Sequence, residues 1–192
     1  MGEIKFEQHK LFGAVIHPSR VPTGDIVIIG DYATSANSKS DFSGFAAGTI
    51  AEVDNCSHLF LIDGILDRWE SRELPYQVVT FAKRYPPSIL RLERLGLSQL
   101  LEDAIQVEAK RQEVNLSISW IQISNKKSAK DLRVTEFQNV FNAGRVHFVG
   151  NDFINPAFHQ LTRYVGGKKQ NGKADEYPDI FGYFALLLNG QL

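Results

Sequence analysis

The chain has 192 residues, of which 43% are hydrophobic and 22% are charged. This length allows one sizeable domain, and the composition excludes a disordered, collagen-like or coiled-coil chain. The 21 Lys and Arg residues nearly balance the 22 Asp and Glu residues, so the net charge of -1 gives no whole-molecule attraction to nucleic acid or membranes. The single cysteine, Cys56, excludes an internal disulfide and a four-cysteine zinc site.

No apolar run approaches the roughly 20 residues needed to cross a bilayer. The N-terminal residues alternate charge with hydrophobicity, whereas a secretory signal would be continuously apolar. We therefore expect a soluble intracellular protein with no membrane partner. No stretch has linker composition or internal repeats. We predict one domain over residues 25–192, preceded by an N-terminal extension over residues 1–24.

Three strands connected as antiparallel hairpins are predicted first. Residues 25–31 contain four consecutive apolar residues and end in Asp31, which is typical of a strand covered on both faces. A turn rich in serine and asparagine follows. Residues 42–53 and 58–69 then form the next two strands.

Helices and strands alternate after these hairpins. A helix is predicted from near Pro75 to just before Pro86, because the position before a proline disfavours helical geometry. Residues 88–93 form a short strand that again ends in an acid, Glu93. The next helix is predicted from apolar residues at helical spacing, which are Leu97, Leu100, Leu101, Ala104 and Ile105.

The C-terminal part predicts two more strands and three helices. Residues 116–123 alternate as a strand, and Ser128 is expected to cap the helix that follows. The apolar face of that helix contains Val134, Phe137 and Phe141. A strand over residues 146–149 and a helix over residues 156–163 come next. The buried stripe of the last helix is expected to contain Ile180, Phe184, Leu187 and Leu188.

This order of elements predicts an α/β fold with a central mixed sheet of about five or more strands, flanked by helices. The first three strands are antiparallel, and crossover helices make the later strands parallel. Right-handed crossovers place the strand of residues 88–93 beside that of residues 25–31. Asp31 and Glu93 would then end neighbouring strands, at the edge where open α/β sheets bind ligands.

A third group of acids, Asp175, Glu176 and Asp179, opens the last predicted helix. Acids in a first turn favour the helix dipole, and a strand-end acid can form a turn, so each acid has a purely structural explanation. Three carboxylates brought together would repel one another unless a divalent cation held them, and oxygen ligands select Mg²⁺ or Mn²⁺. A pair of such ions cleaves phosphodiesters. The chemistry predicted is hydrolysis of nucleic acid.

The segments that carry these acids, residues 28–50, 58–105 and 174–188, resemble the C-terminal nuclease domain of tailed-bacteriophage terminase large subunits. That family has a ribonuclease H-like fold and packages DNA. The resemblance implies that Asp31 and Glu93 are catalytic metal ligands for one or two Mg²⁺ or Mn²⁺ ions.

By the same resemblance, one or more of Asp175, Glu176 and Asp179 completes the metal site. The family commonly shows His-Asp-Asp before the final helix, whereas this chain has Ala174, Asp175 and Glu176. Which helix-start acid binds metal therefore stays open.

The implied activity is that of a two-metal-ion endodeoxyribonuclease that cuts double-stranded DNA with little sequence preference during viral genome packaging. The implied location is the cytoplasm of an infected bacterial host. The expected partners are the terminase ATPase domain, the small terminase subunit and the portal. No GxxxxGK[ST] loop occurs in these residues, so we expect the ATPase motor outside this chain.

Two clusters of basic residues are candidates for contacts with DNA phosphates. One cluster surrounds a predicted helix start and contains Lys126, Lys127, Lys130 and Arg133. The other precedes the last acids and contains Lys168, Lys169 and Lys173. Lysine groups are also common as plain solvated surface.

Two other functions stay open. The first is another ribonuclease H-like nuclease, such as a junction resolvase or a transposase-like enzyme, which a preference for branched over linear duplex would identify. The second is a noncatalytic DNA-docking module whose acids are only surface residues. Such a module would show no stabilisation by calcium or manganese.

Overall fold

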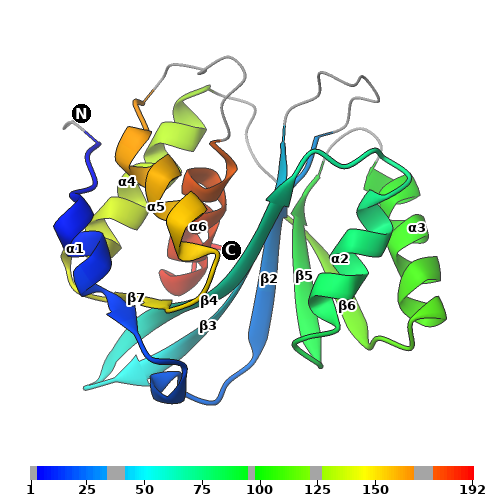
Figure 1. Ribbon diagram of the computed structural model, residues 1–192, viewed down its shortest axis with the longest axis horizontal. Coiled ribbons are helices and arrows are strands. Elements are labelled where there is room, and N and C mark those ends of the chain that lie inside the picture. The colour runs from blue at the N-terminus through cyan, green and yellow to red at the C-terminus, as the bar shows by residue number, and fades with distance from the viewer. Residues whose placement is uncertain (1–3, 34–41, 95–97, 122–126, 167–174) are drawn as a thin grey trace.

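The computed structural model describes residues 4–33, 42–94, 98–121, 127–166 and 175–192, with only the backbone described for residues 127–129. Within these ranges the strands form one seven-stranded sheet in the order β1-β7-β4-β3-β2-β5-β6. Figure 1 shows this sheet twisting between two groups of helices. The strands are β1 (Val15–Ile16), β2 (Ile26–Asp31), β3 (Ser43–Val53), β4 (Cys56–Asp67), β5 (Ser88–Glu93), β6 (Leu116–Ile121) and β7 (Val146–Val149).

The pairing directions confirm the predicted mixed sheet. Strands β2, β3 and β4 pair antiparallel, whereas β5, β6, β7 and β1 join it through parallel pairs. Strand β5 lies beside β2, with Ile29 opposite Arg91 and Gly30 opposite Leu92. The C-terminal ends of β2 and β5 therefore meet at one edge of the sheet, as the sequence predicted.

Each group of helices covers a different part of the sheet. One face of β2, β3, β4 and β7 packs against a first core, and the opposite face of β2, β3, β5 and β6 packs against a second core. The first core is covered by α1 (Gln8–Gly13), α4 (Lys127–Asn142), α5 (Ile154–Arg163) and α6 (Glu176–Leu188). The second core is covered by α2 (Leu74–Ala82) and α3 (Ser98–Arg111). No helix in the described ranges is long and apolar enough to span a bilayer.

Two predicted helix faces differ from those in the structure. In α3 the buried apolar residues are Ile105 and Ala109, with Leu101 partly buried, because this four-residue spacing forms one stripe. Leu100 lies outside that stripe and is 67% exposed. In α6 every residue from Glu176 to Ala185 is buried, because this helix lies inside the first core.

Further corrections concern helix ends. Leu187 and Leu188, predicted in the buried stripe of α6, are only partly buried because the end of α6 lies at the periphery of the core. Helix α4 begins at Lys127, so Ser128 lies inside the helix and does not precede it as a cap. The face of Val134, Phe137 and Phe141 is buried as predicted.

The segment predicted as an N-terminal extension takes part in the fold. Strand β1 pairs with β7, Val15 lying opposite Phe148. Phe6 and Leu11 are buried in the first core. A strand of two residues gives too short a pattern for prediction from sequence, because an alternation needs about four residues to be detected.

Candidate active site

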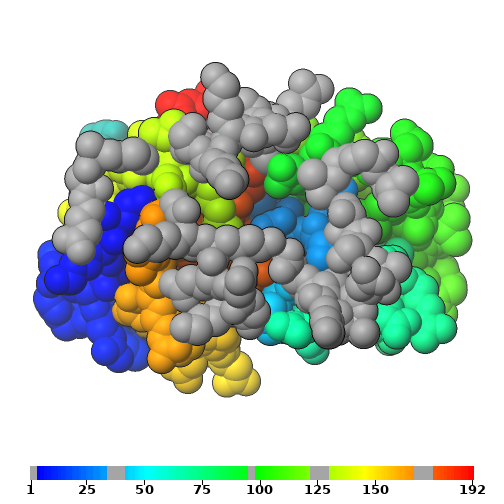
Figure 2. Space-filling model, turned by 90° about the horizontal axis from the view of Figure 1, so that it is seen from above, coloured from blue at the N-terminus to red at the C-terminus, as the bar shows by residue number. Residues whose placement is uncertain are grey.

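Two of the predicted acids lie at the shared edge of β2 and β5. The register of the parallel pair runs from Ile26 opposite Ser88 to Gly30 opposite Leu92, so Asp31 and Glu93 come next on neighbouring strands. Val27 and Ile29, at alternate positions before Asp31, face the first core, so Asp31 points to the same face of the sheet as α6. Glu93 points to that face too, because Leu90 and Leu92, which alternate with it on β5, face the second core. Figure 2 views the molecule onto this edge, with the end of β2 near the middle of the face.

Helix α6 brings the third group of acids to the same face. Its first turn lies against the start of β3, where a Cβ added at Gly44 would come within 3.2 Å of both Glu176 Cβ and Ile180 Cδ1. Only a residue without a side chain permits this approach. Glu176 and Asp179 are both buried, and Asp31 pairs with Gly44 in the antiparallel ladder. The predicted acids of β2, β5 and α6 are thus brought together.

The carboxylates at this edge interact electrostatically. Burial, and next the negative charge of Asp179, raise the pKa of Asp31 to about 7, and Glu93 and Glu176 add to this rise. Burial and then the charge of Asp179 also raise the pKa of Glu93. Burial raises the pKa of Glu176 to about 7, and the charge of Asp175 contributes. Fewer negative charges are therefore present near neutral pH than the residue types suggest.

Two basic side chains of α4 partly neutralise the acids of α6. Lys130 Nζ lies 3.2 Å from Asp175 Oδ2 and 3.8 Å from Asp179 Oδ2. The Arg133 Nε donates a hydrogen bond to Asp179 Oδ1 at 2.7 Å, and Arg133 Nη2 forms an ion pair with the same oxygen at 2.6 Å. Helices α4 and α6 cross closely here. A Cβ added at Gly182 would lie only 2.7 Å from Arg133 Cβ, which shows how near the two helices come.

The structure thus gives two of the predicted DNA-binding residues a role inside the protein. Lys130 and Arg133 contact carboxylates of α6. The other five predicted DNA-binding side chains lie outside the described residues, and they are Lys126, Lys127, Lys168, Lys169 and Lys173. Contact of this set with DNA stays a prediction.

Carboxylate oxygens of this kind fit a hard divalent cation. Glu176 Oε2 is buried and has no hydrogen-bond partner. Asp31 and Glu93 have raised pKa values because their negative charges are buried beside other acids. Within the described ranges, no group of three or more His, Cys, Asp or Glu side chains is arranged so that it could hold a metal ion. Asp175 and Asp179 instead point to Lys130 and Arg133.

The fold of the whole chain is similar to that of several solved structures. The structure is similar to the nuclease domain of the large terminase subunit of bacterial virus Sf6, with a TM-score of 0.60, 9% identity, and coverage of 95% of this chain and 96% of that one. It is also similar to a manganese-soaked human cytomegalovirus terminase nuclease domain, with a TM-score of 0.58, 9% identity and 96% of each chain covered.

The chain has the fold of the terminase nuclease domain. A third similar structure is the fowlpox virus resolvase in complex with Holliday junction DNA, with a TM-score of 0.51, 14% identity, and coverage of 87% of this chain and 99% of that one. No protein-family profile and no curated protein sequence matches the chain. At these identities the likeness establishes the ribonuclease H-like fold, which the sequence resemblance had predicted.

One residue of this candidate site was not singled out from the sequence. Tyr183 lies one helical turn after Asp179, its ring lies 4.4 Å from the Arg133 guanidinium, and its hydroxyl is buried without a hydrogen-bond partner. Burial, and next the charge of Asp179, raise its pKa. The four-residue spacing from Asp179 is the only sequence signal that points to it.

Proposed function

We propose that this protein is a metal-dependent endonuclease that cleaves double-stranded DNA with little sequence specificity. The observation that carries the proposal is the convergence of Asp31, Glu93 and the acids of α6 at one edge of the sheet. An all-carboxylate set with a buried unpartnered oxygen on Glu176 supports a site for Mg²⁺ or Mn²⁺. The terminase and resolvase folds that resemble this chain support nucleic acid as the substrate class.

Asp31, Glu93 and one acid of α6 would hold one or two divalent cations. Among the acids of α6, Asp179 has the larger electrostatic effect on Asp31, followed by Glu176, which favours Asp179 as the third ligand. Such ions supply an activated water and stabilise the leaving oxygen in phosphodiester cleavage. Arg133 would orient Asp179 through a hydrogen bond and an ion pair to Oδ1, leaving Oδ2 toward Lys130.

The biological setting that we propose is the packaging of a viral genome in the cytoplasm of an infected bacterium. The structural match spans 95% of this chain and 96% of the Sf6 domain, which supports the role of a terminase large-subunit nuclease. The partners would be duplex DNA, the terminase ATPase domain, the small terminase subunit and the portal.

A plasmid-nicking assay tests the proposed activity. Supercoiled plasmid incubated with the protein should be converted to nicked and linear forms in Mn²⁺ or Mg²⁺ and left intact in EDTA. Asp31→Asn should abolish conversion, while the control Asp25→Asn, which changes the same residue type beyond the opposite end of β2, should cut like the wild type. Wild-type protein that stays inert at high concentration, or Asp31→Asn that cuts equally well, would defeat the proposal.

The similarity to the fowlpox virus resolvase favours branched DNA as the alternative substrate. A four-way junction and a linear duplex with the same arm sequences should be compared in the same Mn²⁺ buffer. Equal cleavage of both supports the terminase-like function. A strong preference for the junction, with paired cuts across it, supports a resolvase instead.

A further inference from the structure

One face of β5 and β6 is partly exposed beside the acidic edge. Helices α2 and α3 cover the other face of these strands through Leu90, Leu92 and Leu116. The side chains that alternate with those residues belong to Ile89, Arg91, Ser117 and Ser119, which we call the β5–β6 face. Ile89 is 36% exposed, and Ser117 is also exposed. Neither hydrophobic core includes any of these four residues, whereas Ile121, next on the same side of β6, is buried in the first core.

Arg91 occupies the middle of this face, next to the candidate site. It points to the same side of the sheet as Glu93, two residues further along β5, and a strand separates such positions by about 6.6 Å. That distance is comparable with the spacing of neighbouring phosphates along a DNA strand. In register, Arg91 lies between Ile29 of β2 and Ser119 of β6.

Among the described residues, the guanidinium of Arg91 contacts no carboxylate. Arg84, Arg111 and Arg133 each contact a carboxylate. The Arg91 side chain makes no hydrogen bond or ion pair with the described residues, and its Nε is buried without a partner. Holding a cation partly buried and unpaired is unfavourable unless a ligand completes it.

We propose that Arg91 binds the phosphate adjacent to the one at the acidic edge and that the β5–β6 face carries this DNA strand. The inference rests on the proposed function and adds to it the path of the substrate. The chain has a net charge of -1 and its candidate site is rich in acids, so a nearby unpaired guanidinium supplies local attraction for a phosphate. The hydroxyls of Ser117 and Ser119 are donors for the same backbone.

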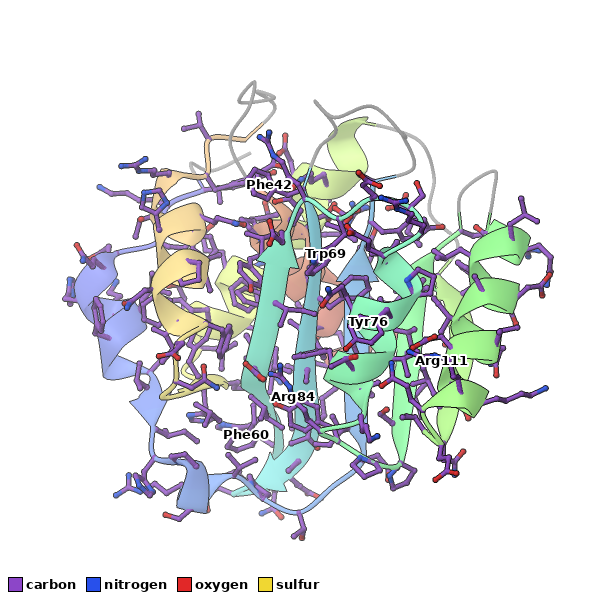
Figure 3. All side chains as sticks on the ribbon, turned by 45° about the vertical axis from the view of Figure 1, so that its right-hand side comes forward. Phe42, Phe60, Trp69, Tyr76, Arg84 and Arg111 are labelled. Atoms are coloured by element: carbon purple, nitrogen blue, oxygen red, sulfur yellow. The ribbon has the colours of Figure 1, made fainter. Side chains whose placement is uncertain are left out.

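The test measures binding of a short duplex by fluorescence anisotropy in EDTA, where metal-dependent cleavage cannot occur. Wild type, Arg91→Gln, Arg91→Lys and the control Arg111→Gln are compared between about 50 and 200 mM salt. Arg111 lies on α3, which covers the opposite face, and Figure 3 shows it on that side of the sheet. Thermal melts of each variant establish that it is folded.

Arg91→Gln should weaken binding roughly tenfold at low salt and reduce the slope of log affinity against log salt by about 0.9, the value for one phosphate contact. Arg91→Lys should keep the slope, and Arg111→Gln should bind like the wild type. An unchanged slope for Arg91→Gln, or an equal loss in Arg111→Gln, overturns the inference. A wild type that binds no duplex also overturns it.

A second variant covers the case in which Arg91→Gln fails to fold. Ser117→Asp places a negative charge on an exposed position of the β5–β6 face and should weaken binding at least several-fold. Normal binding by Ser117→Asp overturns the inference. These binding results are separate from the nicking assay, so a protein that binds through Arg91 but never cuts would count against the proposed function alone.

Discussion

Asp31 and Asp63 look alike in the sequence but differ in the structure. Each follows an apolar run in a central strand, Asp31 in β2 and Asp63 in β4. Asp63 faces α2, where its Oδ2 accepts hydrogen bonds from Arg84 Nη1 at 2.9 Å and Tyr85 Oη at 2.8 Å. Its Oδ1 accepts from the Gly64 backbone N–H at 2.8 Å. Figure 3 shows Arg84 on this side of the sheet.

Asp31 instead lies at the end of its strand among other acids. Burial and the charge of Asp179 raise its pKa, and no hydrogen bond to its carboxylate is found among the described residues. An acid with a full set of donors stabilises the fold, whereas an acid pressed against other acids is held there at a cost in stability. This contrast supports the edge of β2 and β5, and not the interior of β4, as the proposed site.

The largest expected effect separates the two aspartates by activity. Asp31→Asn should reduce metal-dependent nicking of plasmid by more than about 100-fold, because removing even the indirect partners of a metal site costs 10- to 100-fold. Asp63→Asn should retain the wild-type rate per folded molecule, because this residue lies on the opposite face of the sheet. Initial rates are measured in Mn²⁺ and normalised to the folded fraction from circular dichroism.

Asp63→Asn should nevertheless lower the free energy of unfolding by about 1–3 kcal/mol. The variant has one acceptor oxygen fewer and adds an amide N–H beside the Arg84 and Tyr85 donors. Urea denaturation measures this loss. Equal loss of activity in both variants would remove the functional distinction between the two aspartates.

The second prediction compares Arg133, which pairs with Asp179 at the acidic edge, with Arg84, which pairs with Asp63. Arg133 and Asp179 have side chains that are only 9% and 7% exposed, so Arg133→Met should cost about 3–5 kcal/mol of unfolding free energy by leaving a buried charge poorly paired. The Arg84 side chain is 52% exposed, and Arg84→Met should cost less than about 1 kcal/mol. Urea denaturation in EDTA provides both values. Similar costs would show that burial does not distinguish the two ion pairs.

The sequence was sufficient to predict most of the fold. Uninterrupted apolar residues before Asp31 and Glu93 mark the ends of β2 and β5, and the crossover rule makes these strands neighbours. The weaker predictions concern which side of a helix is buried. The exposure of Leu100 depends on the angle at which α3 lies on the sheet, and that angle is set by contacts distant in the sequence.

The candidate site was harder to predict than the fold. The acids could be named because each occupies a recognisable strand end or helix start. Their partners could not be assigned, since Lys130 and Arg133 meet the acids of α6 only through the close crossing of α4 and α6 at Gly182. The unpaired state of Arg91 is likewise invisible in a sequence, because it reflects what is missing around a side chain.

The third prediction uses the pH dependence of stability. Asp31 has a folded-state pKa of about 7 against an ordinary value of 3.8, and Glu93 and Glu176 are also raised. The folded protein therefore binds more protons than the unfolded chain between about pH 4 and pH 7, and stability in EDTA should fall as pH rises through this range.

Asp31→Asn should remove part of this loss and raise the unfolding free energy at pH 8 by about 2 kcal/mol, with a gain of only about a third of that near pH 5. This gain in unfolding free energy is smaller than the full pKa difference would give, because Asp31 is partly exposed and its charge interacts with those of its neighbours. Urea titrations of both proteins at the two pH values measure the change. A variant that is equally stabilised at pH 5 would place the effect outside the titration of Asp31.

The smallest effects are expected for two tyrosines, Tyr85 beside Asp63 and Tyr183 beside Asp179. Tyr85→Phe removes the hydroxyl that donates to Asp63 and should cost about 1 kcal/mol. Tyr183→Phe removes a buried hydroxyl that has no partner, so it should leave the stability of the metal-free protein unchanged or slightly increased. Both are measured by urea denaturation in EDTA at one pH, because the two substitutions delete the same atom and differ only in surroundings. A loss for Tyr183→Phe as large as that for Tyr85→Phe would mean that the Tyr183 hydroxyl is satisfied in solution, and the acidic edge would then be less strained than its unpaired polar groups indicate.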